Sequence, residues 1–215
     1  MRLVLVLLRS IFSLLYHQFA WTYDLVAATV SLGRWKDWVQ SALPYLDGRI
    51  LEIGFGPGHL QLSLHARGLP AFGLDESRQM ARRASRLLRK KGCLPKLSRG
   101  LAQNLPFMKN SFNSMVATFP SEYIFDPHTL KEIRRVLTPG GKLVVIPTAW
   151  ITGSRIQERL AAWLFQVTGQ APAIEASLRG MNTLFAQNGF DARHELVEFS
   201  GSRVLVMVAT KPRAQ

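Results

Sequence analysis

A short apolar segment, a glycine-rich turn and a helix follow one another in the first third of the chain. Residues 49–53 read Arg-Ile-Leu-Glu-Ile and are typical of a buried strand, and residues 59–67 have the composition of a helix. Gly-Phe-Gly-Pro-Gly lies between them. Glycine lets a ligand approach the backbone closely, and the first turn of a helix offers free N–H groups. This succession predicts a nucleotide-binding α/β fold.

Two features, an acidic residue and the spacing of the glycines, distinguish this turn from a dinucleotide site. Glu52 lies two residues before the first glycine, and the glycines follow the pattern G-x-G-x-G instead of G-x-G-x-x-G. A carboxylate beside the turn would repel a pyrophosphate, whereas it suits a ligand that carries an ammonium and a sulfonium group. Asp75 ends a second predicted strand, 71–75, and lies 17 residues beyond Gly58. Its two oxygens can accept hydrogen bonds from both hydroxyls of a ribose.

The rest of the chain alternates predicted strands and helices, without repeats or low-complexity linkers. We expect one doubly wound, mostly parallel α/β sheet with helices on both faces, an antiparallel edge strand, and the ligand at the carboxyl ends of the strands. A single domain, 1–215, would then consist of N-terminal helices that cover the site (1–45), a cofactor-binding core (46–148), and lid helices with a final hairpin (149–215). Further strands are predicted at 114–118, 142–147, 193–199 and 203–209, and further helices at 128–137, 154–168 and 173–189.

The first 21 residues are apolar but lack the length of a membrane span. The unbroken apolar run covers only Leu3 to Leu8 before Arg9 interrupts it. A span needs about 20 apolar residues, and a secretory signal needs a longer apolar region with a small-residue cleavage site. The apolar residues recur at helical spacing, which favours a helix that roofs the pocket of the domain. The alternative is a helix that lies in a membrane interface. We expect a cytoplasmic protein, with membrane association as the alternative.

Positive charge is concentrated in one segment. The chain has 27 Lys and Arg against 14 Asp and Glu, a net charge of +13. Nine of these cations lie between Arg78 and Arg99, with no acidic residue among them. Arg82, Arg86 and Arg89 fall on one face of a predicted helix whose opposite face is apolar. The basic face is either a solvated surface or a docking surface for the phosphate groups of lipid or RNA.

Six segments occur in the order found in a known family. They read LEIGFGPG, GLDESRQM, GLAQNLPF, SFNSMV, SEYIFDP and EIRRVLTPGGKLVVI, and they lie between Leu51 and Ile146. In this set the chain resembles the class I S-adenosylmethionine-dependent methyltransferases, and most closely the broad group that contains quinone and small-molecule methyltransferases. The resemblance implies a Rossmann-like fold with a seven-stranded sheet, S-adenosylmethionine as the methyl donor, and S-adenosylhomocysteine as the product.

The resemblance also implies roles for the matching positions. Glu52 would face the methionine amino group, and Asp75 would accept the ribose hydroxyls. Phe119 would lie beneath the methionine portion, and Tyr23 resembles an N-terminal tyrosine that closes over the cofactor in this group. The other implied contacts are the wrap around methionine and ribose (Gly54, Phe55, Gly56, Gly58), the neighbourhood of the adenosine (Glu76, Met80) and the edge of the adenine (Ala102, Gln103).

The chain departs from the family pattern at three acidic positions. Where the family often has an acid, this chain has Leu101, Gln103 and Asn113. The amide oxygen of Gln103 or backbone carbonyls would then accept from the adenine amino group. These departures leave open a protein that binds the cofactor without transferase activity.

Methyl transfer from a sulfonium requires alignment of donor and acceptor, and no nucleophile from the enzyme. A phenolic acceptor would still gain from a base. Glu122, Tyr123 and His128 follow the predicted strand 114–118 and are the candidate bases. In the alternative interpretation, Glu122 and Tyr123 only shape the pocket and His128 lies at the surface. The scattered histidines and the single cysteine show no metal-ligand spacing, so no metal is expected.

The methyl acceptor is expected to be a small apolar or lipid-like molecule. In the predicted helices 1–21 and 154–168, apolar residues occupy more than one face of the helix. This suits an apolar pocket or peripheral membrane contact. RNA is the alternative acceptor, prompted by the net charge of +13. The tetrad that the family uses for amino groups of nucleic-acid bases is missing, since Phe119-Pro120-Ser121-Glu122 stands in its place. Nucleic acid is therefore the less favoured partner.

Overall fold

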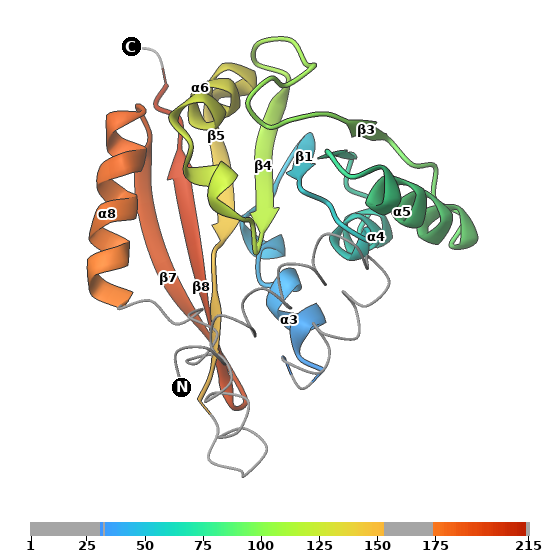
Figure 1. Cartoon of the computed structure of the whole chain (residues 1–215), viewed down its shortest axis with the longest axis horizontal. Helices are drawn as coiled ribbons and strands as arrows, with labels where there is room; N and C mark the ends of the chain where they lie inside the picture. Colours follow the sequence, from blue (N-terminus) through green and yellow to red (C-terminus); the bar gives the residue numbers. More distant parts are fainter. Residues whose placement is uncertain (1–30, 32, 153–173, 214–215) are drawn as a thin grey trace, which may run out of the picture.

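One mixed sheet forms the centre of the molecule, with helices on both of its faces (Figure 1). The computed structural model describes residues 31, 33–152 and 174–213. Neighbouring strands follow the order β3-β2-β1-β4-β5-β8-β6, and β7 pairs with β8. The strands are β1 (Ile50–Ile53), β2 (Ala71–Asp75), β3 (Leu97–Arg99), β4 (Phe112–Thr118), β5 (Leu137–Ile146), β6 (Ala149–Ile151), β7 (Asp191–Phe199) and β8 (Ser202–Thr210).

The direction of the strands sets where a ligand can bind. Strands β3, β2, β1, β4 and β5 run parallel to one another, whereas β8 runs antiparallel to β5 and β7 antiparallel to β8. The predicted α/β class, with a mostly parallel sheet and antiparallel pairing at one edge, is confirmed. Parallel direction brings the carboxyl ends of β1, β2 and β4 to the same edge of the sheet, where ligands of such folds bind.

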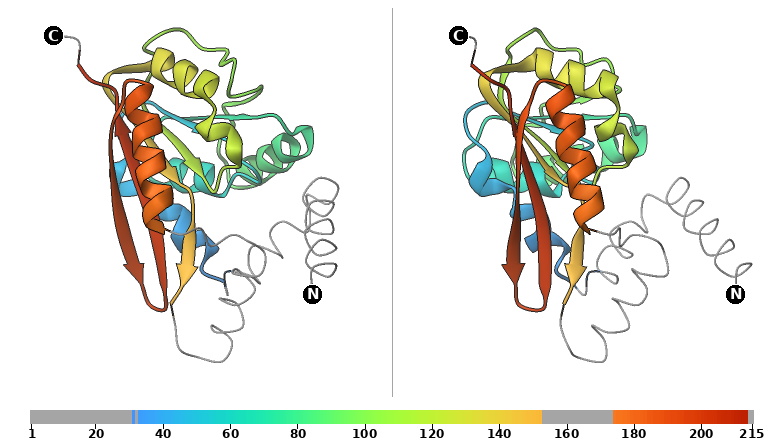
Figure 2. Two further views of the ribbon diagram at one scale, coloured as in Figure 1. Left: turned by 60° about the vertical axis from the view of Figure 1, so that its left-hand side comes forward. Right: turned by 90° about the vertical axis from the view of Figure 1, so that its left-hand side faces the viewer.

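Two layers of helices cover the sheet (Figure 2). Buried residues of α3 and α4 share one apolar cluster with one face of the sheet, and α5 packs against α4. Buried residues of α6 and α8 belong to the cluster on the other face. The helices are α3 (Trp35–Gln40), α4 (His59–Ala66), α5 (Arg78–Lys90), α6 (Pro127–Val136) and α8 (Ile174–Gln187), with short 3-10 turns η1 (Leu43–Tyr45) and η2 (Glu122–Phe125).

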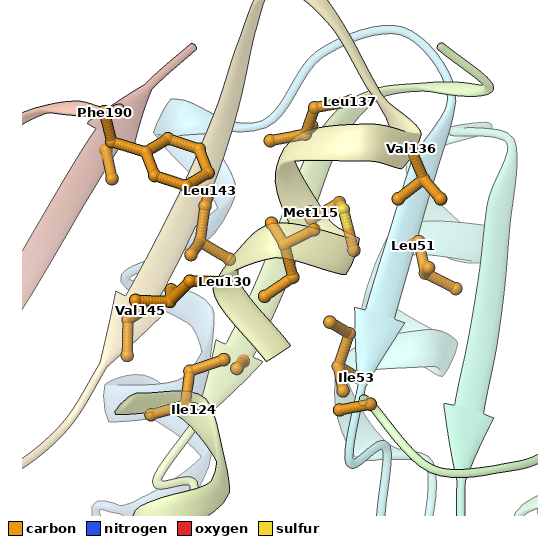
Figure 3. Packing of buried hydrophobic residues seen from close by; sticks show 14 of the residues in the cluster. Leu51, Ile53, Met115, Ile124, Leu130, Val136, Leu137, Leu143, Val145 and Phe190 are labelled. Carbon is orange, nitrogen blue, oxygen red and sulfur yellow. The ribbon is translucent and has the colours of Figure 1, made fainter. Parts of the chain in front are cut away.

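Successive side chains of the central strands point alternately into the two apolar clusters. Leu51 and Ile53 of β1 lie in the cluster beneath α6, together with Met115 and Leu130 (Figure 3). Ile50 lies in the cluster on the α4 face. Because side chains alternate along a strand, Glu52 points to the same face as Ile50, toward α4. The core thus directs one carboxyl group of β1 to the side of the sheet where the glycine-rich turn leads into a helix.

The structure differs from the predicted elements mainly at short strands. Strands β3 and β6 have no counterpart among the predicted segments. Strand β5 begins at Leu137 instead of residue 142, because Leu137 pairs with Phe112 of β4 before the register shifts. Residues 147–148 separate β5 from β6, which pairs with the other end of β8. With this interruption, the described residues form eight strands, where the family resemblance implied seven.

Several predicted features lie outside the described residues. These are the helices 1–21 and 154–168 and the residue Tyr23. Over residues 31, 33–152 and 174–213, no helix combines the length and the apolar character that crossing a membrane requires. The division of the chain into 1–45, 46–148 and 149–215 stays a prediction.

Candidate functional site

The glycine-rich turn joins the carboxyl end of β1 to the start of α4. Gly54, Gly56 and Gly58 have φ angles of +69°, +52° and +91°, a backbone region that favours glycine. A Cβ on Gly58 would lie 2.8 Å from the Cβ of Ala84, so this glycine allows α5 to pack tightly on the turn. At Gly56, no described atom beyond its chain neighbours lies within 4 Å of such a Cβ. The turn is therefore packed at Gly58 and open at Gly56.

Phe55 holds the turn against the second strand. Its side chain is only 3% exposed. A Cβ on Gly73 of β2 would lie 2.7 Å from the ring atom Cδ1 of Phe55. The ring thus fills the space that Gly73 leaves free. A ligand at the turn would therefore contact the backbone of Phe55 and not its ring.

Asp75 at the end of β2 fixes the turn from the other side. Its Oδ2 accepts a hydrogen bond of 2.8 Å from the N–H of Gly56, and its Oδ1 accepts one of 2.8 Å from the N–H of Ser77. Burial raises the pKa of this carboxyl, and the two backbone hydrogen bonds oppose that shift. Each carboxylate oxygen has a further acceptor site, so both can also receive a hydroxyl donor. The carboxyl is thereby prepared for a diol such as a ribose.

Glu52 is a buried acid behind the turn. It is 2% exposed, and burial raises the pKa of its carboxyl from 4.5 to about 8. The hydrogen bond that Gln61 Nε2 donates to Oε2 (2.8 Å) acts in the opposite direction, and the nearby Asp75 adds to the rise of the pKa. Burial of an acid without a cation favours its neutral form. A cationic ligand at the turn would stabilise the charged form.

Gln61 is a site residue that the sequence analysis did not single out. It lies in α4, fully buried, and its Nε2 also donates to the carbonyl oxygen of Phe72 (3.1 Å). One amide group thus connects Glu52 of β1 to the backbone of β2. The available signal was a polar residue directly after Leu60 and three before Leu64, which places it on the inward face of a helix.

A carboxylate–guanidinium pair on α6 holds the loop between β3 and β4. Glu132 Oε2 accepts from the N–H of Leu105 (2.9 Å), and Arg135 donates to the carbonyl oxygens of Leu105 (2.9 Å) and Phe107 (2.7 Å). Arg135 and Glu132 also pair with each other at 2.7 Å. Arg135 lowers the pKa of Glu132, which keeps the acid charged. This arrangement, which we call the α6 clamp, fixes the backbone of residues 105–107.

The α6 clamp holds the segment that carries two predicted adenine contacts. Ala102 is buried at 6% exposure, whereas Gln103 is exposed. Both precede the clamped Leu105 by two or three residues. The sequence alone did not single out Glu132 and Arg135 of the clamp, because charged residues three apart on a helix are common at protein surfaces.

The three candidate bases occupy different positions after β4. Tyr123 lies beside the turn, since its hydroxyl donates to the carbonyl oxygen of Ile53 (3.3 Å) and would lie 2.6 Å from a Cβ on Gly54. Glu122 and His128 are exposed, and the backbone N–H of His128 donates to Oδ1 of Asp126 at the start of α6. Of the three predicted bases, the structure brings only Tyr123 to the turn.

Phe119 marks the end of β4 with an unusual backbone. Its φ angle is +49°, and its ring centroid lies 4.2 Å from that of Trp35 and 6.2 Å from that of Trp38. The aromatic rings of α3 thus meet the carboxyl end of β4. This places an apolar wall next to the turn, on the α3 and α4 face of the sheet.

The remaining predicted contacts lie at the start of α5. Glu76 is exposed, and its carbonyl oxygen accepts from the guanidinium of Arg99 (3.2 Å). Met80 is half-buried in the first turn of α5, which Ser77 caps by accepting from the N–H of Met80 (3.3 Å). Tyr23 lies outside the described residues. Within the described ranges, no group of three or more His, Cys, Asp or Glu is arranged to hold a metal ion.

The comparison with protein families decides the assignment. Residues 51–145 match the family described as "Methyltransferase domain". By this match, the segment is a methyltransferase domain. It contains Glu52, the turn, Asp75 and the α6 clamp, so the family resemblance of the sequence is confirmed. S-adenosylmethionine is the cofactor that this family assignment supports.

Individual relatives agree with the methyltransferase assignment. The chain is 29% identical over 142 residues to the ubiquinone/menaquinone biosynthesis C-methyltransferase UbiE of Blochmanniella floridana. The aligned region covers 61% of this chain and 56% of that protein. It is 32% identical over 102 residues to a phosphatidylethanolamine N-methyltransferase of Cereibacter sphaeroides, covering 46% of this chain and 50% of the relative. The chain thus spans about half the length of these two relatives.

Solved structures show the methyltransferase fold. A SAM-dependent methyltransferase from Methanosarcina mazei superposes with a TM-score of 0.57 at 22% sequence identity, covering 80% of this chain and 97% of that structure. The likeness extends over most of the chain, beyond the segment that matches the family.

Proposed function

We propose that this protein transfers a methyl group from S-adenosylmethionine to a small apolar or lipid-like acceptor. The observation that carries the proposal is the turn 54–58, held between the buried Glu52 and the doubly hydrogen-bonded Asp75 at one edge of a parallel sheet. The methyltransferase domain that contains these residues supports the same donor.

Each part of the site would bind one part of the donor. Glu52 would neutralise the cationic methionine end, and the open turn at Gly56 would lie against its backbone and ribose. Asp75 would accept the ribose hydroxyls, with Glu76 and Met80 beside the adenosine. Ala102 and Gln103 would edge the adenine, Phe119 would lie near the methionine, and Tyr23 would close over the site.

Bound S-adenosylmethionine supplies a methyl group on a positively charged sulfur that leaves as a neutral thioether. The residues of the chain then need only orient the donor, exclude water and admit the acceptor along the line of the S–CH₃ bond. The rings of Trp35 and Phe119 give the carboxyl end of β4 an apolar surface that excludes water. Of the candidate bases, Tyr123 lies closest to the turn, where its hydroxyl would relay a proton from a phenolic acceptor to water by releasing its own proton as it accepts the new one.

The relatives support the class of acceptor. By name, one acts in ubiquinone and menaquinone biosynthesis and another on phosphatidylethanolamine. Quinones of that kind are largely apolar and phospholipids are amphipathic, and both reside in membranes. The proposal therefore includes a peripheral contact between this protein and a lipid surface, where such an acceptor would be met.

The test is methyl transfer to a panel of acceptors. The full-length protein is incubated with methyl-labelled S-adenosylmethionine and a quinone, a phenolic lipid, phosphatidylethanolamine vesicles or bulk RNA, and the label is followed into organic and aqueous phases. We expect label in the organic phase with at least one apolar acceptor, and its loss in Asp75→Asn. Asp191→Asn makes the same chemical change at an exposed position of β7 and should keep the activity.

Two outcomes would overturn the proposal. Transfer of label to RNA alone would replace the apolar acceptor by nucleic acid. Binding of S-adenosylmethionine without transfer to any acceptor in the panel would favour a cofactor-binding protein without transferase activity.

A further inference from the structure

Helix α5 and strand β3 form one flank of the molecule. Strand β3 is the end of the sheet in the order of strands, and α5 packs beside it and against α4 (Figure 1). Ala84 and Leu88 are the fully buried side chains of α5. The opposite face of the helix is therefore directed away from the domain.

The sequence of this flank is strongly basic, and Glu76, whose carbonyl oxygen accepts from Arg99, is the acidic residue that directly precedes it. From Ser77 to Ser121 the chain carries ten Lys and Arg and no Asp or Glu. Arg82, Arg86 and Arg89 are exposed on the outer face of α5. The exposed cations of the flank, which we call the α5 surface, are Arg78, Arg82, Arg86, Arg89, Lys90, Lys91, Lys96 and Arg99.

Apolar side chains accompany these cations. Leu94, in the turn between α5 and β3, is 78% exposed and lies between Lys91 and Lys96 in the sequence. Leu101, which follows β3, is 55% exposed. Exposed leucines are costly in water but favourable where side chains can enter the interface of a bilayer.

We propose that the α5 surface docks this protein onto a membrane of anionic phospholipid. Cations close to such a membrane are attracted by its negative surface potential, and Leu94 would enter the boundary between headgroups and acyl chains. Single-stranded RNA readers stack bases on exposed aromatic rings. The large apolar side chains that are exposed in the described part of the chain are Leu94, Leu101, Met108 and Leu196, and none is aromatic. The combination of cations with aliphatic side chains favours lipid.

The α5 surface is separate from the candidate methyl-transfer site but adjacent to it. Helix α5 begins three residues after Asp75, and its outer face takes no part in the hydrogen bonds around the turn that the structure shows. Docking through this surface would bring the protein to the phase in which an apolar acceptor is dissolved. The inference deepens the proposed function, because it names the surface and the kind of lipid for the peripheral contact. Its test is separate, because the surface can bind lipid whether or not a methyl group is transferred.

The test is co-sedimentation of the full chain with vesicles. Phosphatidylcholine vesicles with and without phosphatidylglycerol are compared at low and high salt. We expect binding to the anionic vesicles that falls at high salt, because salt screens exposed charges. The triple variant Arg82→Gln, Arg86→Gln and Arg89→Gln should reduce partitioning by about fivefold for each cation, or about a hundredfold in all.

A matched variant separates a local surface from net charge. Lys131→Gln, Arg179→Gln and Arg193→Gln remove three exposed cations from α6, α8 and β7, so both triple variants lower the net charge from +13 to +10. This control should partition like the wild type. Leu94→Gln should weaken binding at high salt, where the apolar contribution dominates.

Specific results would overturn the inference. Equal losses in the two triple variants would show that net charge acts without a docking surface, and no binding to anionic vesicles would show that the α5 surface is merely solvated. Retention on structured RNA, lost only in the α5 variant and unaccompanied by vesicle binding, would assign the surface to nucleic acid. Calorimetric affinity for S-adenosylmethionine, measured in the same variants, shows independently whether the candidate site remains intact.

Discussion

At the scale of single residues, the site uses buried acids that the fold stabilises only partly. Asp75 receives two backbone N–H groups, whereas Glu52 receives one amide from Gln61. Burial raises the pKa of Glu52 to about 8, and its single hydrogen bond from Gln61 opposes that rise only in part. An acid held in this state favours a ligand that brings positive charge.

The affinity for S-adenosylmethionine should rise with pH up to about pH 8. Below that value Glu52 is protonated in the free protein, so binding of a cation must release its proton, and this release costs less as the pH increases. Calorimetry in buffers of different ionisation enthalpy would detect the proton. Glu52→Gln should bind more weakly and lose this pH dependence, while the exposed Glu76→Gln should retain it. Proton release that persists in Glu52→Gln would contradict the assignment.

The same shift predicts a gain in stability on removal of the charge. Because folding raises the pKa of Glu52 from 4.5 to about 8, the unfolded chain loses this proton at a lower pH than the folded protein does. The stability of the fold therefore falls as the pH rises between these values. Glu52→Gln should therefore have a higher Tm than the wild type at pH 8, and the difference should vanish near pH 4. Measurement of Tm against pH checks this, and a lower Tm at pH 8 would argue against the raised pKa.

At the scale of secondary-structure elements, close packing around the turn decides its shape. A Cβ on Gly58 meets the backbone and side chain of Ala84, and the φ angle is +91°. Gly68 also has a positive φ, of +68°, but nothing in the described chain lies within 4 Å of its Cβ position. A side chain at either position would strain the backbone, but only a side chain at position 58 would also overlap with a neighbouring residue.

Gly58→Ala should therefore destabilise the protein more than Gly68→Ala does. Both changes carry backbone strain of about 1–2 kcal/mol, and overpacking against Ala84 adds about 1–3 kcal/mol at residue 58 alone. Denaturant unfolding measures both free energies. Equal losses for the two variants would mean that α5 moves away without cost.

Arg135→Gln should weaken the binding of S-adenosylmethionine by loosening residues 105–107. Because the α6 clamp acts on the loop and not on the transferred methyl group, KM should rise several-fold with little change in kcat. Arg134→Gln is the matched control, since Arg134 contacts the carbonyl oxygen of Gly189 (3.3 Å) instead. A fall in kcat with unchanged KM would contradict the role of the α6 clamp in positioning the loop between β3 and β4.

Long, regular elements could be predicted from the sequence, whereas short ones could not. The spacing of Arg82, Arg86 and Arg89 indicates a helix where α5 lies, and the strands of the final hairpin are predicted within two residues of their bounds. Strand β3 has only three residues, Leu97–Arg99, two of them exposed, so it carries no apolar pattern. The contact between Gln61 and Glu52 depends on the packing of α4 on β1, and no local pattern contains that information.

At the scale of the whole molecule, one end of the sheet is basic and the other end is mixed in charge. The parallel half of the sheet ends in a flank without acidic residues from Ser77 to Ser121, whereas β7 at the other end carries Asp191, Glu195 and Glu198 together with Arg193. The candidate site lies at the carboxyl ends of strands between these flanks. This distribution gives the molecule a direction with respect to a charged surface.

Calorimetric titration with S-adenosylmethionine tests the central claim most directly. The wild type should bind one equivalent. Asp75→Ala should weaken binding about ten- to a hundredfold for each lost hydrogen bond to the charged carboxylate, whereas the exposed Asp191→Ala should not. Gly56→Val should bind still more weakly, because its side chain would occupy the open space at the turn. If Asp75→Ala and Gly56→Val both kept the affinity of the wild type, the turn between Glu52 and Asp75 would not be the site of the methyl donor.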